Sequence, residues 1–285
     1  MSKVSKRRIS NIKTRRDIKR KRARNMRRFY VSSVSNKASL ENFSHLISTL
    51  RIPKEHEEEY IEIYRVLISL RVESIPRKSG GIKGSLERLQ STSMSLNQVY
   101  LHRLISLYEG VFYALATNNY YLVALSMRAL FETTAALGYL YNRLNSYSEG
   151  NIESETLDDD LMILFLGTKD KLLQESNPYE PKNVMKMLDF ADKIFVSKFL
   201  KQQAPSKNML REIYEWLCEY CHPNFHSTTI ACQLDKKNQQ LNFNHFSTLD
   251  MRKTQIPIIE PIIIGTKTFV HMYYNSGQLI DALKK

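Results

Sequence analysis

The sequence predicts an all-α protein: a helical bundle that carries one small β-hairpin and a disordered, basic N-terminal arm. Three observations favour this fold class. Only 9 Gly and 8 Pro occur among 285 residues, of which 42% are hydrophobic, and this composition is typical of a folded protein with few loops. Apolar residues recur at helical spacing through most of the chain. The charge surplus is confined to one end, because residues 1–30 hold 14 Lys and Arg but only one acidic residue.

The arm, residues 1–38, carries the whole charge surplus. The chain has 42 Lys and Arg against 29 Asp and Glu, a formal net charge of +13, whereas residues 31–285 hold 28 of each kind and sum to zero. A block of this kind cannot bury an apolar face, so we expect it to be disordered when it is unbound. Clustered Arg and Lys neutralise phosphates, and arginine-rich segments fold when they meet RNA. The arm is therefore predicted to bind nucleic acid, with RNA favoured over DNA.

The residues of the arm that we predict to contact nucleic acid are Arg7, Arg8, Arg15, Arg16, Lys19, Arg20, Lys21, Arg22, Arg24, Arg27 and Arg28. A solubilising tail, a tether to anionic membranes and a nuclear-import signal are alternatives that need fewer charges. No base specificity follows from the arm, because phosphate contacts position a protein without reading sequence.

The bundle is expected to form one domain over residues 39–285. Its N-terminal part, residues 39–75, is predicted to hold two helices, 40–50 and 54–72, which Pro53 separates. Acidic residues occupy the first turn of the second helix, where the helix dipole favours negative charge. Residues 76–85 contain three of the nine glycines and are predicted to be a linker.

The remaining residues, 86–285, are predicted to form the core of the bundle. A long helical pattern spans residues 86–118, and a second pattern over residues 121–144 has almost no polar stripe, which predicts the central helix. The acidic run 146–160 is expected to be a loop. Further helices are predicted at residues 161–175, 182–199, 206–221 and 258–283. Residues 228–234 and 241–246 are predicted to be the strands of a hairpin.

Two charged residues interrupt the apolar pattern of the predicted central helix. Arg128 and Glu132 are four residues apart and can pair, although the base precedes the acid, which is the less favourable order. A charge inside a bundle destabilises the fold unless it has a partner. We therefore expect both residues to face polar groups of neighbouring helices, either as an ion pair that fixes helix register or within a functional cleft.

A second candidate lies where helix 206–221 ends. Pro223 biases the residue before it away from the helical conformation, which places His222 and Asn224 at the C-terminal corner of the helix. Proton transfer near neutral pH needs a group such as imidazole, so His222 is a candidate acid or base. The alternative is that His222 and Asn224 only cap the helix and brace the hairpin.

These two patterns together resemble a known family. The string R-x-L-F-E, followed by Y-x-x-L-x-E-x-x-H-P-N, is similar to a group of bacterial all-helical proteins related to HEPN domains. The matching residues are Arg128, Leu130, Phe131, Glu132, Tyr214, Leu217, Glu219, His222, Pro223 and Asn224. The resemblance covers roughly residues 86–283. It implies a helical bundle, often dimeric, and many such proteins are metal-independent ribonucleases of toxin and antiphage systems.

In HEPN ribonucleases an R-x(4–6)-H signature supplies an Arg that stabilises the phosphorane and a His that moves protons during attack by a 2′-OH. This chain departs from that signature. Its match at Arg51 to His56 spans Pro53, and about one such match is expected by chance in this composition. A ribonuclease built on this chain would take the pair from two different helices. The predicted catalytic residues are Arg128, Glu132, His222 and Asn224.

Cysteine and histidine residues crowd near the end of the same helix. A zinc site is an alternative that remains for Cys218, Cys221, His226 and Cys232, although their spacing matches no zinc finger or ribbon. The sequence has no G-x-x-x-x-G-K-[ST], G-x-G-x-x-G or H-E-x-x-H motif, so we predict no cofactor.

The three cysteines do not form a disulfide framework, and the N-terminus lacks the apolar segment of a secretory signal, so we expect a cytoplasmic protein. The longest apolar stretch is interrupted by charged and polar residues, so we expect no membrane span.

Two hypotheses about function follow from these features. The first is an RNA-binding, HEPN-like effector of a bacterial toxin or antiviral defence system, with metal-independent nuclease activity as its candidate chemistry. The alternative is a non-catalytic protein whose arm docks on nucleic acid while the bundle assembles with partner proteins. A homodimer or a partner protein is compatible with either hypothesis.

Overall fold

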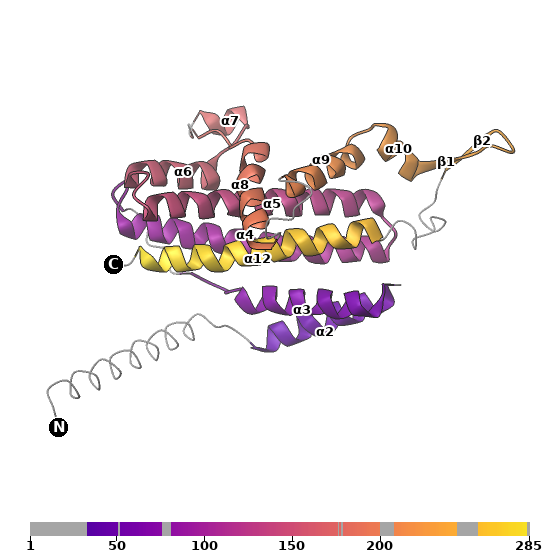
Figure 1. Ribbon diagram of the computed structural model, residues 1–285, viewed down its shortest axis with the longest axis horizontal. Coiled ribbons are helices and arrows are strands. Elements are labelled where there is room, and N and C mark those ends of the chain that lie inside the picture. Colours follow the sequence, from indigo (N-terminus) through magenta and orange to yellow (C-terminus); the bar gives the residue numbers. More distant parts are fainter. Residues whose placement is uncertain are drawn as a thin grey trace, which may run out of the picture.

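A computed structural model describes residues 33–50, 52–75, 81–175, 177, 179–199, 208–243 and 256–283. Over these residues the chain forms ten helices and one two-stranded sheet (Figure 1), which confirms the predicted all-α class with one β-hairpin. The helices are α2 (Ser33–Thr49), α3 (Lys54–Leu70), α4 (Leu86–Ala116), α5 (Tyr120–Ser148), α6 (Ser154–Leu166), α7 (Lys171–Gln174), α8 (Val184–Phe199), α9 (Met209–Cys221), α10 (Phe225–Ala231) and α12 (Ile256–Ala282). The strands are β1 (Cys232–Asp235) and β2 (Gln240–Phe243).

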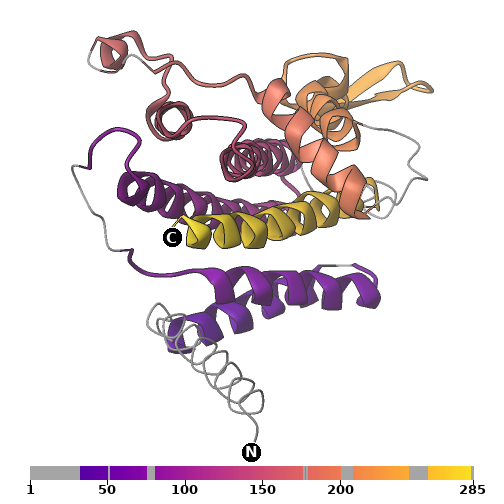
Figure 2. The ribbon, with the colours of Figure 1, turned by 60° about the vertical axis from the view of Figure 1, so that its left-hand side comes forward.

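Three long helices, α4, α5 and α12, form the body of the bundle. They run side by side in Figures 1 and 2, and α5 also contacts α6, α8 and α9. Phe131 and Leu137 of α5 are completely buried, as the prediction of a central helix requires. The helix begins after Asn119, whose side chain accepts a hydrogen bond from the Leu122 N–H at 3.1 Å and so caps the first turn.

Within the described ranges, no helix has both the length and the apolar character needed to cross a membrane.

The N-terminal helices α2 and α3 pair and cover one face of this body (Figure 2). Aromatic rings join them to α4: the ring centroids of Phe43 and Tyr64 are 4.1 Å apart, and Phe112 of α4 lies 5.3 Å from Phe43. The structure corrects one boundary here, because α2 begins at Ser33 and residues 33–38, which we assigned to the arm, are helical. The sequence SVSNKA of this segment has no apolar residues recurring at helical spacing, and that pattern begins only at Leu40.

The acidic run 146–160, predicted to be a loop, is mostly helical. The central helix continues to Ser148, and α6 begins at Ser154. Two aspartates of this run are buried and ion-paired: Asp158 Oδ1 lies 2.9 Å from Arg88 Nε, and Asp160 Oδ2 lies 2.6 Å from Arg143 Nε. Acidic side chains that point inward toward arginines have no signature in a hydrophobic pattern, which explains the error.

The helix predicted over residues 161–175 is also divided. α6 ends before Gly167, where a Cβ atom would lie 2.4 Å from the Ile163 carbonyl oxygen and 2.9 Å from the Pro181 Cα. The chain therefore leaves the helix at a position that only glycine fits. One further turn, α7, follows after the Asp170 side chain caps it.

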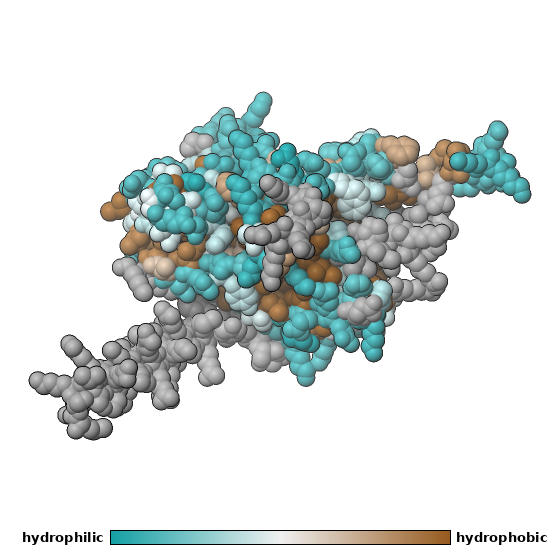
Figure 3. Space-filling model, viewed as in Figure 1, coloured by the Kyte–Doolittle hydropathy of each residue, from teal (hydrophilic) through white to brown (hydrophobic). Residues whose placement is uncertain are grey.

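The predicted hairpin is present but shorter than expected. Residues 225–231 form α10, and β1 pairs with β2 in antiparallel register, with Cys232 opposite Phe243 and Asp235 opposite Gln240. Figure 3 shows the hairpin protruding from the body, with a hydrophilic tip. The helix forms because Asn224 begins it with a capping box, which outweighs the strand preference of the following threonines.

The other predicted helices are confirmed to within a few residues. α8 begins at Val184 and α9 at Met209, and α12 begins at Ile256 and continues through Pro261. Residues 76–80 of the predicted linker, residues 206–207 of the predicted helix 206–221 and residues 244–246 of the predicted second strand lie outside the described residues, as does the arm as far as residue 32.

Candidate functional site

A polar stripe runs along one face of the central helix α5. At 3.6 residues per turn its members, three or four residues apart, lie within about 80° of the helix circumference. The stripe consists of Arg128, Glu132, Tyr139 and Arg143, with the apolar Ala136 at the position between Glu132 and Tyr139. It begins against α9, where Arg128 contacts Tyr214, and it ends against α6 and α8, where Tyr139 contacts Asp160 and Phe190. The predicted catalytic pair is therefore one end of a longer feature.

At the first end of the stripe, Tyr214 of α9 joins the two predicted charges. Its hydroxyl accepts hydrogen bonds from Arg128 Nε and Nη2, each at 3.4 Å, and donates one to Glu132 Oε1 at 3.1 Å. Arg128 Nε also lies 3.3 Å from Glu132 Oε1, and the two side chains are 28% and 33% exposed. Tyr214 is thus the polar group of a neighbouring helix that this pair was expected to face. The pair is neither deeply buried nor fully solvated.

The electrostatics of this end keep Arg128 charged and Tyr214 protonated. Burial raises the pKa of Tyr214 to about 12, although the hydrogen bond from Arg128 opposes the rise. The hydrogen bond to Tyr214 raises the pKa of Arg128. Burial also raises the pKa of the Cys221 thiol, and the Arg128 guanidinium beside it lowers that pKa in part. Arg128 of α5 is thus joined to α9 through Tyr214.

His222 and Asn224 follow directly at this corner, as predicted, but they have different surroundings. His222 is the exposed C-cap of α9, and its backbone N–H donates to the Cys218 carbonyl oxygen at 3.2 Å. Its ring has no hydrogen-bond partner among the residues that the structure describes. We call Arg128, Glu132, Tyr214, Cys221 and His222 the α9 corner.

Asn224 is engaged on both sides of its amide. Its Oδ1 accepts a hydrogen bond from the Ser227 N–H at 3.2 Å, and its Nδ2 donates to Glu219 Oε2 at 2.8 Å. The Asn224 N–H donates in return to Ser227 Oγ at 3.0 Å. Asn224 is thus the N-cap of α10, a helix that was not predicted, and not a cap of α9 as the alternative had it.

The cysteines near this corner do not gather into a metal site in the described part of the chain. No group of three or more His, Cys, Asp or Glu side chains is placed there to hold a metal ion. Cys218, Cys221 and Cys232 are free thiols. Cys232 lies on β1 and its thiol donates to the Thr228 carbonyl oxygen at 3.5 Å.

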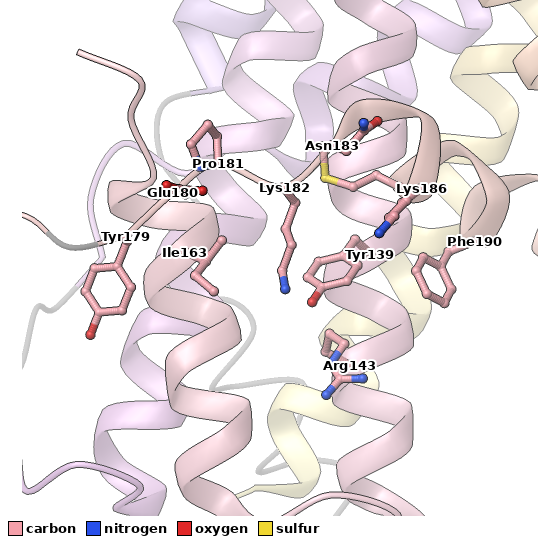
Figure 4. A pocket seen from close by; sticks show the side chains of 11 residues that line it. Tyr139, Arg143, Ile163, Tyr179, Glu180, Pro181, Lys182, Asn183, Lys186 and Phe190 are labelled. Carbon is pink, nitrogen blue, oxygen red and sulfur yellow. The ribbon is translucent and has the colours of Figure 1, made fainter. Parts of the chain in front are cut away.

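The second end of the stripe was not predicted from the sequence. Tyr139 Oη donates to Asp160 Oδ1 at 2.5 Å, and Arg143 Nε donates to Asp160 Oδ2 at 2.6 Å. Beside them lies a pocket of about 560 Å³ (Figure 4), to which α8 and the segment before it contribute Lys182 and Lys186. A signal did exist in the sequence: Tyr139 and Arg143 continue the helical spacing of Arg128 and Glu132.

Glu132 connects the two ends. It lines a smaller pocket of about 210 Å³ together with Arg103, Lys182 and Met187, the last two of which also line the larger pocket. The polar face of α5 is thus accessible to solvent at several points between α9 and α6.

Comparison with known proteins finds no counterpart: no protein-family model matches this chain, and neither does any curated protein or any solved structure.

Proposed function

We propose that this protein binds nucleic acid, and that residues 1–30 supply most of the affinity. The observation that carries the proposal is the division of charge, with a net charge of +13 on these residues and zero on residues 31–285. A neutral bundle has no general attraction for a polyanion, whereas Arg and Lys clusters gain free energy when they release counterions from phosphates.

The salt dependence of binding tests this proposal. If the arm contacts six phosphates, the logarithm of the binding constant falls with the logarithm of salt concentration with a slope of roughly −4 to −5. Deleting residues 1–30 leaves α2, which begins at Ser33, intact. Circular dichroism should therefore show an unchanged helical bundle. The deletion should weaken binding to a structured RNA by about 100-fold or more. Unchanged affinity and slope would show that the arm is not the binding segment.

A second candidate function is metal-independent cleavage of RNA at the α9 corner. One observation favours it: Arg128 of α5 is hydrogen-bonded to Tyr214 of α9, the helix that ends directly before His222. Arginine can stabilise the charge of a phosphorane, and histidine can move protons during attack by a 2′-OH. Glu132 and Tyr214 would hold Arg128 in place. The resemblance to HEPN-related proteins, and with it a role in a toxin or antiphage system, belongs to this proposal.

Cleavage is tested by incubating the purified protein with total RNA in the presence of a chelator. Arg128→Gln and His222→Ala should each reduce cleavage by about 100-fold or more, since each removes one part of the chemistry. Arg211→Gln is the matched control, because Arg211 is a partly buried arginine of α9 that pairs with Asp189 and Glu215 away from the α9 corner. If both site variants cleave as fast as the control, the α9 corner is not the active site.

The alternative, a non-catalytic protein that docks on nucleic acid and assembles with partners, gives a different result. The intact chain would then bind RNA with the same salt dependence but produce no cleavage products. Copurification from cells would identify the bound nucleic acid and protein.

A further inference from the structure

The larger pocket at the second end of the stripe has the size and lining of a ligand site. It has a volume of about 560 Å³, within the range of about 300–1,000 Å³ that small-molecule sites occupy. Figure 4 shows side chains of α5, α6 and α8, and of the segment before α8, around it. We call it the Arg143 pocket. Its lining residues are Tyr139, Arg143, Ile163, Tyr179, Glu180, Pro181, Lys182, Asn183, Lys186, Met187 and Phe190.

Positive charge exceeds negative charge around this pocket. Asp160 is 7% exposed and serves as the shared acceptor for Tyr139, Arg143 and Lys182, with Lys182 Nζ 3.4 Å from its Oδ1. Glu180 of the lining is a second carboxylate beside these two cations. Lys186 adds a third cation, and it has no ion pair or hydrogen-bond partner among the described residues.

The guanidinium of Arg143 is fixed with part of its donor capacity unused. Its Nε is committed to Asp160 at 2.6 Å, and the side chain is 20% exposed. Its two terminal nitrogens have no hydrogen-bond partner within the described part of the chain, although Arg143 lines the pocket. A guanidinium that is held by Nε presents a planar pair of donors, and this geometry suits an oxyanion with several oxygens.

The start of α8 adds to this preference. The helix begins at Val184, directly after Asn183, and its first turn contributes Lys186 and Met187 to the pocket. Backbone N–H groups at a helix N-terminus favour negative charge nearby. In Figure 4 the Lys182 ammonium, the Arg143 guanidinium and the Tyr139 hydroxyl face the same space, whereas the Glu180 carboxylate lies beside Pro181.

One wall of the pocket is apolar and aromatic. Phe190 and Tyr139 meet edge to face with ring centroids 5.6 Å apart, and Ile163 and Met187 extend this wall. An inorganic anion alone would leave such a wall without a contact. A ligand that fills the pocket therefore joins an anionic group to an organic body.

We infer that the Arg143 pocket binds the phosphate monoester group of a small organic molecule, with Arg143, Lys182 and Lys186 on the phosphate oxygens and the organic part against Phe190. A phosphate monoester has three terminal oxygens and carries close to two negative charges at neutral pH, so its oxygens can accept from all three cations at once. A carboxylate has only two oxygens and one charge. The inference does not depend on nucleic-acid binding by the arm, which lies outside the described residues.

Isothermal titration calorimetry on the full chain tests this inference. The probes are ribose 5-phosphate and adenosine 5′-monophosphate, with adenosine and inorganic phosphate as the two halves of the ligand. Both esters should bind with a stoichiometry of one, and each half should bind at least tenfold more weakly. Lys186→Gln should weaken ester binding by about tenfold, because it removes one charge-assisted hydrogen bond, and it cannot disturb an ion pair in the described fold.

Matched variants separate the pocket from the arm. Lys171→Gln removes the same charge from α7, where Lys171 is exposed and does not line the pocket, so it should bind the esters as the wild type does. Arg143→Gln should abolish binding, with circular dichroism as the check that it folds. All of these chains keep the arm, so its contribution cancels. If the esters do not bind, or if Lys186→Gln and Lys171→Gln bind them equally, the inference is wrong.

A further comparison identifies the source of the phosphate. A 5′-phosphorylated RNA trinucleotide is compared with the same trinucleotide that ends in a 5′-hydroxyl. If both free esters and the phosphorylated RNA bind, and Lys186→Gln weakens each of them, the pocket recognises the phosphate monoester wherever it occurs. If only the phosphorylated RNA shows this dependence, the pocket is specific for an RNA end and not for a small molecule, which overturns the inference as stated.

Discussion

The two ends of the stripe on α5 use the same three kinds of residue in different ways. Each end joins an arginine, a carboxylate and a tyrosine: Arg128, Glu132 and Tyr214 at one end, and Arg143, Asp160 and Tyr139 at the other. At the α9 corner the tyrosine lies between the two charges, with bonds of 3.1–3.4 Å. At the Arg143 pocket the carboxylate lies at the centre and accepts bonds of 2.5 and 2.6 Å.

The difference follows from where the carboxylate comes from. Glu132 lies on the same helix as its arginine and its side chain is 33% exposed, whereas Asp160 comes from α6 and its side chain is 10% exposed. A carboxylate that is buried between helices depends on its donors for stability, while a half-exposed one can still be solvated. Arg128 is therefore held by longer and more exposed contacts than Arg143 is.

Removing each carboxylate in turn gives the largest expected contrast. Asp160→Asn should lower the free energy of unfolding by about 3 kcal/mol, because it leaves Arg143 without its buried partner. Glu132→Gln should lower it by about 0.5 kcal/mol, as expected for a half-exposed pair. Urea denaturation followed by circular dichroism measures both values.

The control for this pair is Asp159→Asn. Asp159 is adjacent to Asp160 in sequence, but its side chain is 44% exposed where it pairs with Lys83, so its loss should change the free energy of unfolding by less than about 1 kcal/mol. Equal effects of Asp160→Asn and Glu132→Gln would mean that the two ends do not differ in the way the burial of their carboxylates suggests.

A substitution between the two ends tests whether they are independent. Gly138 of α5 faces α8, and a Cβ atom there would lie 2.9 Å from the Ala191 Cβ and 3.1 Å from its Cα. Gly138→Ala should therefore push α8 away and lower the free energy of unfolding by about 2 kcal/mol. It should weaken ester binding at the Arg143 pocket, which α8 lines, more than RNA cleavage at the α9 corner, which α8 reaches only through its contact with α9.

Gly277→Ala on α12 serves as the comparison for that substitution. A Cβ atom at this position has no atom within 4 Å, so the higher helix propensity of alanine should raise the free energy of unfolding by up to about 1 kcal/mol. If Gly138→Ala were also stabilising, the close packing of α8 on α5 would not require glycine at position 138.

The first end of the stripe was predicted from the sequence, whereas the second end is signalled there only in part, by the helical spacing of Tyr139 and Arg143. Arg128 and Glu132 are conspicuous because they interrupt an apolar helix, and Pro223 fixes the end of α9. The pocket brings together Arg143, Asp160 and Lys186 from three helices, and none of them interrupts a pattern within its own segment.

The errors in the predicted fold have the same physical origin. The run 146–160 is helical from Ser154 because Asp158 and Asp160 find arginine partners on other helices. Local hydrophobic periodicity cannot reveal a partner that is distant in sequence. The start of α10 at Asn224, by contrast, is a local capping signal that the sequence contained and the strand preference of Thr228 and Thr229 concealed.

The smallest expected difference in the free energy of unfolding is between removal of the Tyr139 hydroxyl and removal of the Tyr214 hydroxyl. Tyr139→Phe removes a hydrogen bond of 2.5 Å to the buried carboxylate of Asp160, and it should lower the free energy of unfolding by about 2 kcal/mol, as for other hydrogen bonds to charged groups. Tyr214→Phe removes longer bonds at a half-exposed pair and should lower it by about 1 kcal/mol. Thermal and urea denaturation of the two variants provide the measurement.

A double-mutant cycle at each end decides the comparison. Combining Tyr139→Phe with Asp160→Asn should cost less than the sum of the single effects, because the two groups bond to each other. Tyr214→Phe combined with Glu132→Gln should show a smaller coupling free energy, about 0.5 kcal/mol, because the bond between these side chains is longer and Glu132 is more exposed than Asp160. Strong coupling at the α9 corner would mean that Tyr214 locks Arg128 as firmly as Asp160 locks Arg143, and an arginine held in that way would be less free to move toward a phosphate.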